Sequence, residues 1–182
     1  QAHAKEIEFK AKDILLEESG KNIYLKDFKY VFMRKDPPVD ENYMNTLHLL
    51  DLAQSNGANV INNPSAVKKF NEKIFALYFT KYIPSTLISS KASELKAFAK
   101  DFSEIVIKPL NGMGGESIYK LSEIGSDEES IIQELTNKGK TSIVGQEFLP
   151  EIYDGDFRIL IINGKPFNKT LARIPQGESF KG

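Results

Sequence analysis

The sequence predicts a mixed fold, with a parallel α/β part at its N-terminal end and an α+β part with antiparallel sheets after it. Three observations lead to this prediction. Helix-like and strand-like segments alternate along all 182 residues, a strand, helix, strand succession lies between residues 30 and 62, and the strongest hairpin signal follows near residue 163. With 41% hydrophobic and 27% charged residues, the composition is that of a folded globular chain.

The N-terminal third contains the elements of a parallel βαβ unit. Alternating residues 4–9 resemble a strand, and apolar residues 30–33 form a short second strand that Pro37 and Pro38 bring to an end. A helix is expected from Asp40, its N-cap, to about residue 55, followed by a strand at 59–62. Two strands joined through a helix in this way pair in parallel.

For the remainder of the chain we expect antiparallel strands with a few helices. Asn63 and Pro64 have the residue types of a helix start, and Asn163-Gly164 has those of a tight hairpin turn. Helices are expected at 64–70, 74–82, 92–101 and 131–135, and strands at 86–88, 105–109, 117–121, 142–146, 158–162 and 165–167.

Charge and cysteine content exclude several classes of protein. The 24 basic and 25 acidic residues give a net charge of −1, so we expect no nucleic-acid partner. A cysteine count of 0 excludes disulfides, thiolate catalysis and cysteine-ligated zinc. The longest apolar runs, such as 159–162, are far shorter than the ~18 residues of a membrane span, so we expect no membrane partner and a cytoplasmic location.

The two ends of the sequence resemble internal positions of a longer chain. It starts at Gln1 without a methionine and enters a strand-like segment within a few residues, and it stops at Gly182 without a closing helix. We therefore expect a fragment that lacks both termini of a longer product.

One segment, residues 105–118, carries a pattern with chemical meaning. Lys108 ends an apolar strand, and Gly112, Met113, Gly114 and Gly115 follow before the next strand. A cation beside glycines, whose backbone N–H groups are open to an anion, is typical of a polyphosphate cradle. The spacing alone favours a plain hairpin with a glycine tip, because the dinucleotide-binding and Walker patterns both fail here.

Together with this segment, five further motifs along the chain distinguish a phosphate site from a plain hairpin. They are Met33-Arg34-Lys35-Asp36-Pro37-Pro38, Asn71-Glu72-Lys73, Lys108-Pro109 with the glycine segment, Gln146-Glu147-Phe148-Leu149-Pro150, Asp154-Gly155-Asp156-Phe157-Arg158 and Leu171-Ala172-Arg173-Ile174-Pro175-Gln176-Gly177. In the order of these motifs and in their residues, the chain resembles the bacterial glutathione synthetases of the ATP-grasp superfamily over nearly its whole length. The resemblance implies an ATP-grasp fold whose C-terminal part is missing.

The resemblance also implies a nucleotide site. In that family a helix lysine and a strand lysine grip the phosphates of ATP, here Lys73 and Lys108, and the loop of Gly112, Met113, Gly114 and Gly115 closes over the γ-phosphate. The segment Gln146, Glu147, Phe148 and Leu149 matches the residues that bind the adenine, and Asp156 matches the sugar end. Without the neighbouring motifs, the same segment is equally compatible with an ordinary strand end.

Three arginines are the candidates for the reacting groups. Arg158 and Arg173 lie on neighbouring strands, so both guanidinium groups could face one cleft and bind a transferring phosphoryl group. A solvated ion pair is the alternative for these two. Arg34 follows the N-terminal strand and, with Arg173, is a candidate to hold a substrate carboxylate.

The activity implied by the resemblance is ATP-dependent ligation of γ-glutamylcysteine to glycine through an acyl phosphate, with release of ADP and phosphate. The Mg²⁺ ligands of the family are expected beyond residue 182, so no metal ligands are assigned and we expect this chain to be inactive alone. Glu178 and Lys181 depart from the family pattern. The alternatives are a non-catalytic nucleotide-binding fragment and another ATP-grasp ligase with a different carboxylate substrate.

Three domains are expected from the positions of these motifs. Residues 1–71 form a partial substrate domain, residues 72–145 the nucleotide-binding lobe, and residues 146–182 the first strands of a second lobe. The sequence leaves homo-oligomerisation open.

Overall fold

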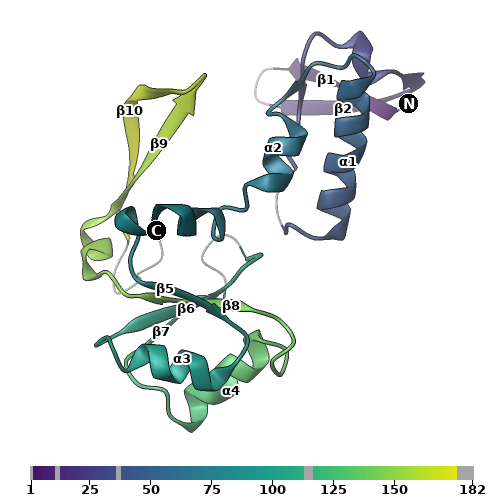
Figure 1. Ribbon diagram of the computed structural model, residues 1–182. Coiled ribbons are helices and arrows are strands. Elements are labelled where there is room, and N and C mark those ends of the chain that lie inside the picture. The colour runs from purple at the N-terminus through teal and green to yellow at the C-terminus, as the bar shows by residue number, and fades with distance from the viewer. Residues whose placement is uncertain (1, 11–12, 36–37, 113–116, 176–182) are drawn as a thin grey trace. The chain divides into compact units, whose positions relative to one another are not determined.

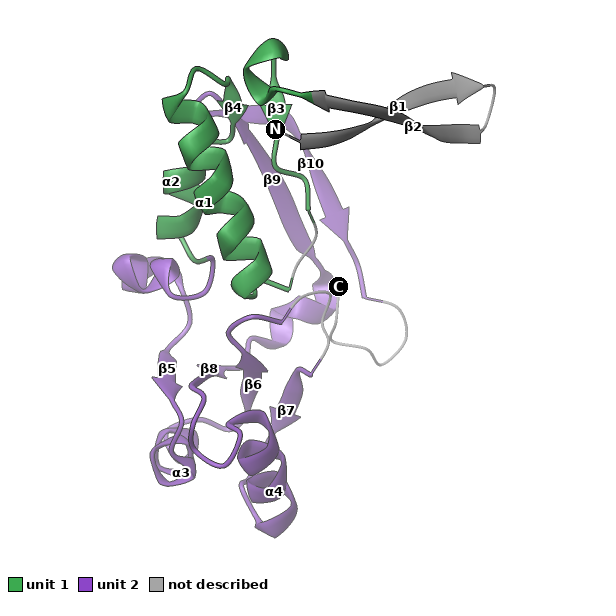
Figure 2. Cartoon of the chain, turned by 90° about the vertical axis from the view of Figure 1, so that its right-hand side faces the viewer, with its two compact units in different colours: residues 1–71 green, residues 72–182 purple. Residues whose placement is uncertain are grey.

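The chain folds as two compact units, residues 1–71 and 72–182, which Figure 2 shows in green and purple. The computed structural model describes residues 2–10, 13–35, 38–112 and 117–175, and of residues 2–10 and 13–22 it describes the backbone. Met113, Gly114 and Gly115, and also Glu178 and Lys181, therefore lie outside the described residues. Each unit is described by itself below.

A β-hairpin opens the first unit. Strand β1 (Ala2–Lys10) pairs antiparallel with β2 (Asp13–Ile23), and the register shifts by an irregularity between His3 and Lys5. The strand expected at residues 4–9 is confirmed, whereas its partner β2 was not predicted. The reason is that residues 13–23 mix apolar, acidic and small residues without strict alternation.

The predicted parallel unit follows the hairpin (Figure 2). Strands β3 (Val31–Phe32) and β4 (Val60–Ile61) pair in parallel through helix α1 (Glu41–Ser55), so this prediction is confirmed with strands shorter than expected. The Asp40 carboxylate accepts a hydrogen bond from the Tyr43 N–H at 2.8 Å and caps the helix. Leu50 of α1 packs with Val60 and Ala58 into the core of this unit.

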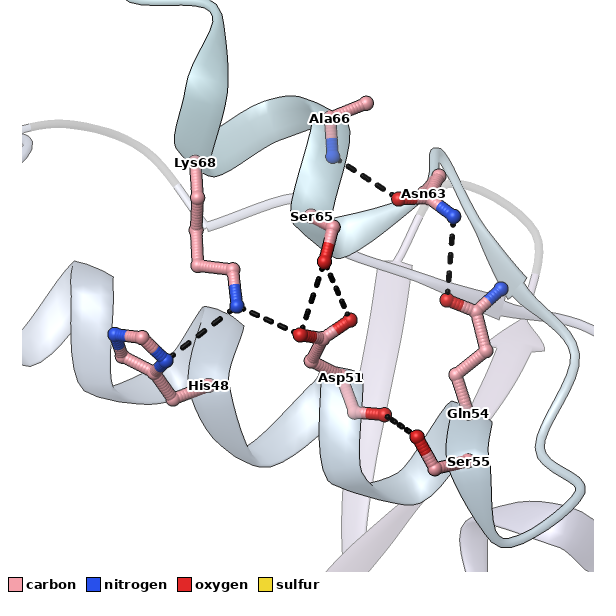
Figure 3. A network of polar contacts seen from close by, with 8 residues as sticks. All are labelled: His48, Asp51, Gln54, Ser55, Asn63, Ser65, Ala66 and Lys68. Carbon is pink, nitrogen blue, oxygen red and sulfur yellow. Dashed lines mark hydrogen bonds and ion pairs between the residues drawn. The ribbon is translucent and has the colours of Figure 1, made fainter.

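Helix α2 (Pro64–Lys69) is fixed to α1 by the polar network of Figure 3. The Asp51 carboxylate accepts hydrogen bonds from the Ser65 hydroxyl at 2.9 and 3.0 Å and from Lys68 Nζ at 2.7 Å. These bonds, led by the one from Lys68, hold the pKa of Asp51 below its usual value. The same ammonium lies 3.4 Å from His48 Nδ1, so His48 takes part in helix packing.

A four-stranded sheet organises the second unit. Its spatial order is β5 (Thr86–Ser89), β8 (Ile143–Glu147), β6 (Ile105–Pro109), β7 (Tyr119–Leu121), and every neighbouring pair is antiparallel. This arrangement confirms the predicted antiparallel sheet.

Helices α3 (Ala92–Ala99) and α4 (Ser126–Leu135) cover one face of that sheet (Figure 1). Leu95 and Ile132 from the helices pack on alternate strand residues, among them Ile105, Ile107 and Ile143, and all five side chains are buried. Because side chains alternate across a strand, Val106, Lys108 and Gln146 point to the opposite face, which these helices leave uncovered.

Helix α4 begins five residues before the predicted segment 131–135. Its start is polar: the backbone N–H of Gly125 donates to the Glu128 carboxylate at 3.0 Å, and three acidic residues occupy the first turn. Negative charge at this end of a helix interacts favourably with the helix dipole. A search for apolar periodicity finds only the later turns, which is why the prediction was too short.

The second unit ends with a separate two-stranded ribbon. Strands β9 (Asp156–Ile162) and β10 (Lys165–Arg173) pair antiparallel across the predicted turn, where Asn163 and Gly164 both have positive φ, 50° and 75°.

The described residues also form short 3-10 helices, which are η1 (Leu25–Asp27), η2 (Phe75–Tyr82) and η3 (Pro150–Asp154). Within the ranges given above, the helices are all too short or too polar to cross a membrane.

Candidate functional site

The face of the four-stranded sheet opposite α3 and α4 contains a small cavity of about 210 Å³. Alternation brings Val106, Lys108 and Gln146 to this face from the two central strands, β6 and β8. The remaining walls come from segments that leave the sheet at its ends. The lining residues are Pro84, Val106, Lys108, Ile118, Gln146, Glu147, Phe148, Leu149 and Ile152.

Lys108 brings a half-buried ammonium group to this cavity. Its Nζ donates a hydrogen bond to Gln146 Oε1 at 2.9 Å. Burial lowers the pKa of Lys108, the charge of Lys73 lowers it further, and the carboxylate of Glu72 acts in the opposite direction. A cation that has lost part of its hydration and lies near a second cation gains more than an exposed one from a bound anion.

Lys73, which precedes η2, binds the start of the glycine segment. Its Nζ donates to the backbone oxygens of Leu110 at 3.0 Å and Gly112 at 2.8 Å, and it also lies 3.1 Å from the Glu72 carboxylate. The side chain is only 16% exposed. We expected the glycines to offer N–H donors beside the lysines, whereas Gly112 turns its carbonyl oxygen to the ammonium of Lys73.

Hydrogen bonds to two neighbouring segments hold the last residue of β8, Glu147, and the residue after it, Phe148. The N–H of Glu147 donates to the Ser85 oxygen at 2.9 Å, and the N–H of Phe148 donates to the Glu104 oxygen at 3.1 Å. The Glu147 carboxylate also accepts from the Ser85 N–H at 3.2 Å. A ligand edge in this cavity therefore has to use backbone groups other than these two N–H donors.

Lys120 of β7 is a residue that the sequence reasoning missed. Its Nζ lies 3.0 Å from the Glu104 carboxylate, 3.5 Å from the Tyr153 hydroxyl and 4.7 Å from the centre of the Phe148 ring. The bond to Glu104 raises the pKa of Lys120. The cluster fixes Phe148 at the cavity wall, and no spacing rule connects its four residues, which come from three separate segments of the sequence.

On the ribbon, Asp156, Arg158 and Arg173 share one face. Asp156 lies opposite Arg173 in the register, and Arg158, two residues along β9, lies opposite Leu171. Arg173 binds the Asp156 carboxylate through two nitrogens, with Nε donating to Oδ1 at 2.7 Å and Nη2 donating to Oδ2. These bonds, and then the nearby charge of Arg158, lower the pKa of Asp156.

Arg34 belongs to the first unit, where it follows β3 and is exposed. Among the residues that the structure describes, no group of three or more His, Asp or Glu side chains is suited to hold a metal ion.

Comparison with known proteins gives the same assignment for both units. The family described as prokaryotic glutathione synthetase, ATP-grasp domain, matches residues 72–182, and the N-terminal domain of the same family matches residues 1–68. A glutathione synthetase of Vibrio parahaemolyticus is 40% identical over 162 residues, which is 88% of this chain and 51% of that protein. One from Xanthomonas campestris is 43% identical over 152 residues, 84% of this chain and 48% of that protein.

Solved structures support the fold. A RiPP-associated ATP-grasp ligase of Chryseobacterium gregarium superposes with a TM-score of 0.58 at 16% identity, covering 98% of this chain and 60% of that one. An ATP-grasp protein of Sphaerobacter thermophilus gives 0.55 at 18% identity, with 76% and 54% covered. The chain spans about half the length of the curated relatives that it matches. With both of its units matched, this chain belongs to the prokaryotic glutathione synthetase family.

Proposed function

We propose that this chain belongs to an ATP-dependent ligase that joins γ-glutamylcysteine to glycine, and that it contains the nucleotide-binding part of that enzyme. The observation that carries the proposal is the pair of poorly exposed ammonium groups, Lys73 and Lys108, close enough for one charge to lower the pKa of the other. Burial and the charge of Lys73 both disfavour the protonated form of Lys108, so an anion bound beside the two lysines would stabilise it. The curated relatives named glutathione synthetase supply the class of reaction.

In the proposed complex, the adenine ring occupies the cavity and the phosphates lie towards the two lysines. Because the Glu147 and Phe148 N–H groups already have partners, the backbone oxygen of Glu147 and the N–H of Leu149 are the groups we assign to the adenine edge. Apolar walls from Val106 and Ile118 suit the flat faces of the ring. Asp156 is proposed at the sugar end of the nucleotide.

Two displacement steps account for the chemistry. A carboxylate oxygen of γ-glutamylcysteine attacks the γ-phosphorus and ADP leaves; the glycine amine then attacks the acyl carbon, loses a proton, and phosphate leaves. We propose that Arg158 and Arg173 balance the charge of the transferring group and that Met113, Gly114 and Gly115 close over it. Arg173 has to exchange the Asp156 carboxylate for substrate in this scheme, and Arg34 is proposed to hold a substrate carboxylate.

Magnesium is the second cofactor that we propose for the complete enzyme, where it would neutralise charge on the phosphates. The described residues do not fit it, since they contain no group of three or more His, Asp or Glu side chains placed to hold a metal ion. We therefore assign no step to the metal here and propose that its ligands lie beyond residue 182.

We also propose that residues 1–71 belong to the substrate domain, 72–145 to the nucleotide-binding lobe and 146–182 to the second lobe. We propose a cytoplasmic location, because the proposed reaction consumes ATP. Subcellular fractionation tests the location, and sedimentation velocity tests whether the chain forms homo-oligomers.

The experiment compares ATP binding with turnover. Calorimetric titration of the chain with ATP is followed by an assay of phosphate and glutathione after addition of Mg²⁺, γ-glutamylcysteine and glycine. We expect ATP binding, with turnover only in the full-length protein. Phosphate release that depends on another carboxylate instead would favour a different ATP-grasp ligase, and a full-length protein that binds ATP without turnover would favour a non-catalytic role. Absence of ATP binding would overturn the proposal.

A further inference from the structure

A chain of three hydrogen bonds leads from the backbone to Lys108. The Thr86 hydroxyl donates to the backbone oxygen of Pro84 at 2.7 Å, the Gln146 amide nitrogen donates to Thr86 Oγ1 at 2.7 Å, and Lys108 Nζ donates to Gln146 Oε1 at 2.9 Å. Thr86 and Gln146 are direct register partners on β5 and β8. All of these polar groups are at least partly buried.

The direction of every bond in this chain is fixed by chemistry. An ammonium group can only donate, so the amide of Gln146 has to present its oxygen to Lys108. The amide nitrogen then points to Thr86, whose oxygen is free to accept because its proton is used on the Pro84 carbonyl. Without the Thr86 oxygen, the amide would have no acceptor on that side and could turn its NH₂ group towards the ammonium.

We propose that Thr86 is a positioning residue of the nucleotide site, because it locks the Gln146 amide in the orientation that holds the Lys108 ammonium. The inference rests on the proposed function, since the purpose of holding Lys108 is to present its charge to the phosphates. Thr86 does not touch the ligand in this scheme; it acts through Gln146.

The surroundings of Lys108 explain why an acceptor is needed there. The charged groups that act on its ammonium are Lys73, which disfavours the charge, and Glu72, which favours it; Glu72 has a 79% exposed side chain. Burial already lowers the pKa of Lys108. The Gln146 oxygen, 2.9 Å from Nζ, is thus the close acceptor that holds this partly buried cation in place at the cavity.

The test replaces Thr86 by valine, which has the same shape without the hydroxyl, and by serine, which keeps it. The chain is labelled with ¹³C at lysine Cε, and the titration of Lys108 is followed by NMR without ligand. We expect T86V to lower the pKa of Lys108 and T86S to restore it.

With ATP as the probe, T86V should weaken binding about three- to tenfold, which corresponds to the loss of one net hydrogen bond. The loss should grow as the pH rises, because less Lys108 is protonated.

A second variant separates this role from general destabilisation. Q146M removes the amide itself, and the double variant T86V/Q146M should bind ATP no more weakly than Q146M alone, because Thr86 has nothing left to orient. Thermal unfolding of each variant shows whether it is folded. An unchanged Lys108 titration in T86V, or additive losses in the double variant, would overturn the inference. If wild-type chain takes up no ATP, the proposed function fails while the ligand-free titration still decides the role of Thr86.

Discussion

Lys73 joins two roles in one side chain, because its ammonium group both carries charge and binds the segment that leads into the glycine residues. Replacing it by methionine removes the bonds to the Leu110 and Gly112 oxygens together with the charge. A hydrogen bond with a charged partner contributes about 1.5–3 kcal/mol, so we expect K73M to weaken ATP binding by roughly 10- to 100-fold.

The control for this prediction is Lys81, an exposed lysine of η2. K81M removes the same charge from the same unit without removing a contact to the segment after β6. Calorimetric titration with ATP compares the two variants with wild type. Equal affinities for K73M and K81M would show that Lys73 acts only through the net charge of the chain.

The ion pair of the ribbon predicts a pH effect with a definite sign. Two hydrogen bonds from Arg173 and the more distant charge of Arg158 lower the pKa of Asp156 below the usual 3.8. The stabilisation is fully present above that usual value and is lost as the pH falls through the lower pKa of the folded protein. R173M should therefore raise the pKa of Asp156.

The matched variant for this measurement is R158M, which leaves the direct bonds in place. NMR titration of the Asp156 carboxyl carbon should give the order wild type, R158M, R173M from lowest to highest pKa, since the hydrogen bonds from Arg173 are the largest cause. If R158M had the larger effect, the pair would be broken in solution.

Among the elements, those with a local chemical signal could be predicted. Asp40 caps α1, and Asn163-Gly164 turns the ribbon, because the necessary contacts lie within a few residues. Strand β2 and the first turns of α4 were missed because their residues lack a clean apolar period. Residues 105–107 of β6 are all apolar, so the sequence did not indicate which face of the sheet Lys108 takes.

The contacts that make the candidate site depend on tertiary packing and could not be predicted. Lys73 meets the Gly112 oxygen across 39 residues, and Thr86 meets Gln146 across 60. A sequence pattern can name lysines and glycines that suit a phosphate, but the pairing of β5 with β8 is what brings Thr86 under the amide. Hydrogen bonds of this kind follow from sheet register, which a single sequence does not specify.

The packing of α3 against β8 predicts a coupling between two positions. A methyl group on Gly145 would lie 2.8 Å from Cδ2 of Leu95, which is buried. Such overpacking costs about 1–3 kcal/mol, and L95A alone costs about 2–5 kcal/mol through its cavity. The double variant G145A/L95A should lose less than the sum, because the new methyl group enters the vacated space.

Urea unfolding of the four proteins measures this coupling. L121A, whose residue lies on β7 with β6 between it and β8, is the matched control, since it should add to G145A without coupling. Additive losses for G145A and L95A would contradict the tight contact.

At the scale of the whole molecule, attraction of a nucleotide cannot come from the total charge. The net charge is −1, so the chain as a whole does not attract ATP, and in the proposed function the favourable field comes from the local pair Lys73 and Lys108. A net charge near zero argues against binding to a long polyanion such as nucleic acid. It does not argue against a nucleotide, because two neighbouring lysines are enough to attract a small anion.

Each unit has its own buried core, so we expect a cavity in one core to lower the stability of that unit only. Leu47 of α1 and Ile107 of β6 are both fully buried, one in each unit. L47A should lower the stability of residues 41–71 by about 2–5 kcal/mol, and I107A should do the same in the second unit. Native-state hydrogen exchange resolves the two, because amides report the opening of their own cooperative unit. We expect L47A to leave the slowest amides of β6 and β8 close to their wild-type rates. If either variant accelerated hydrogen exchange equally in both units, the chain would unfold as one cooperative body. The two cores would then not define separate domains.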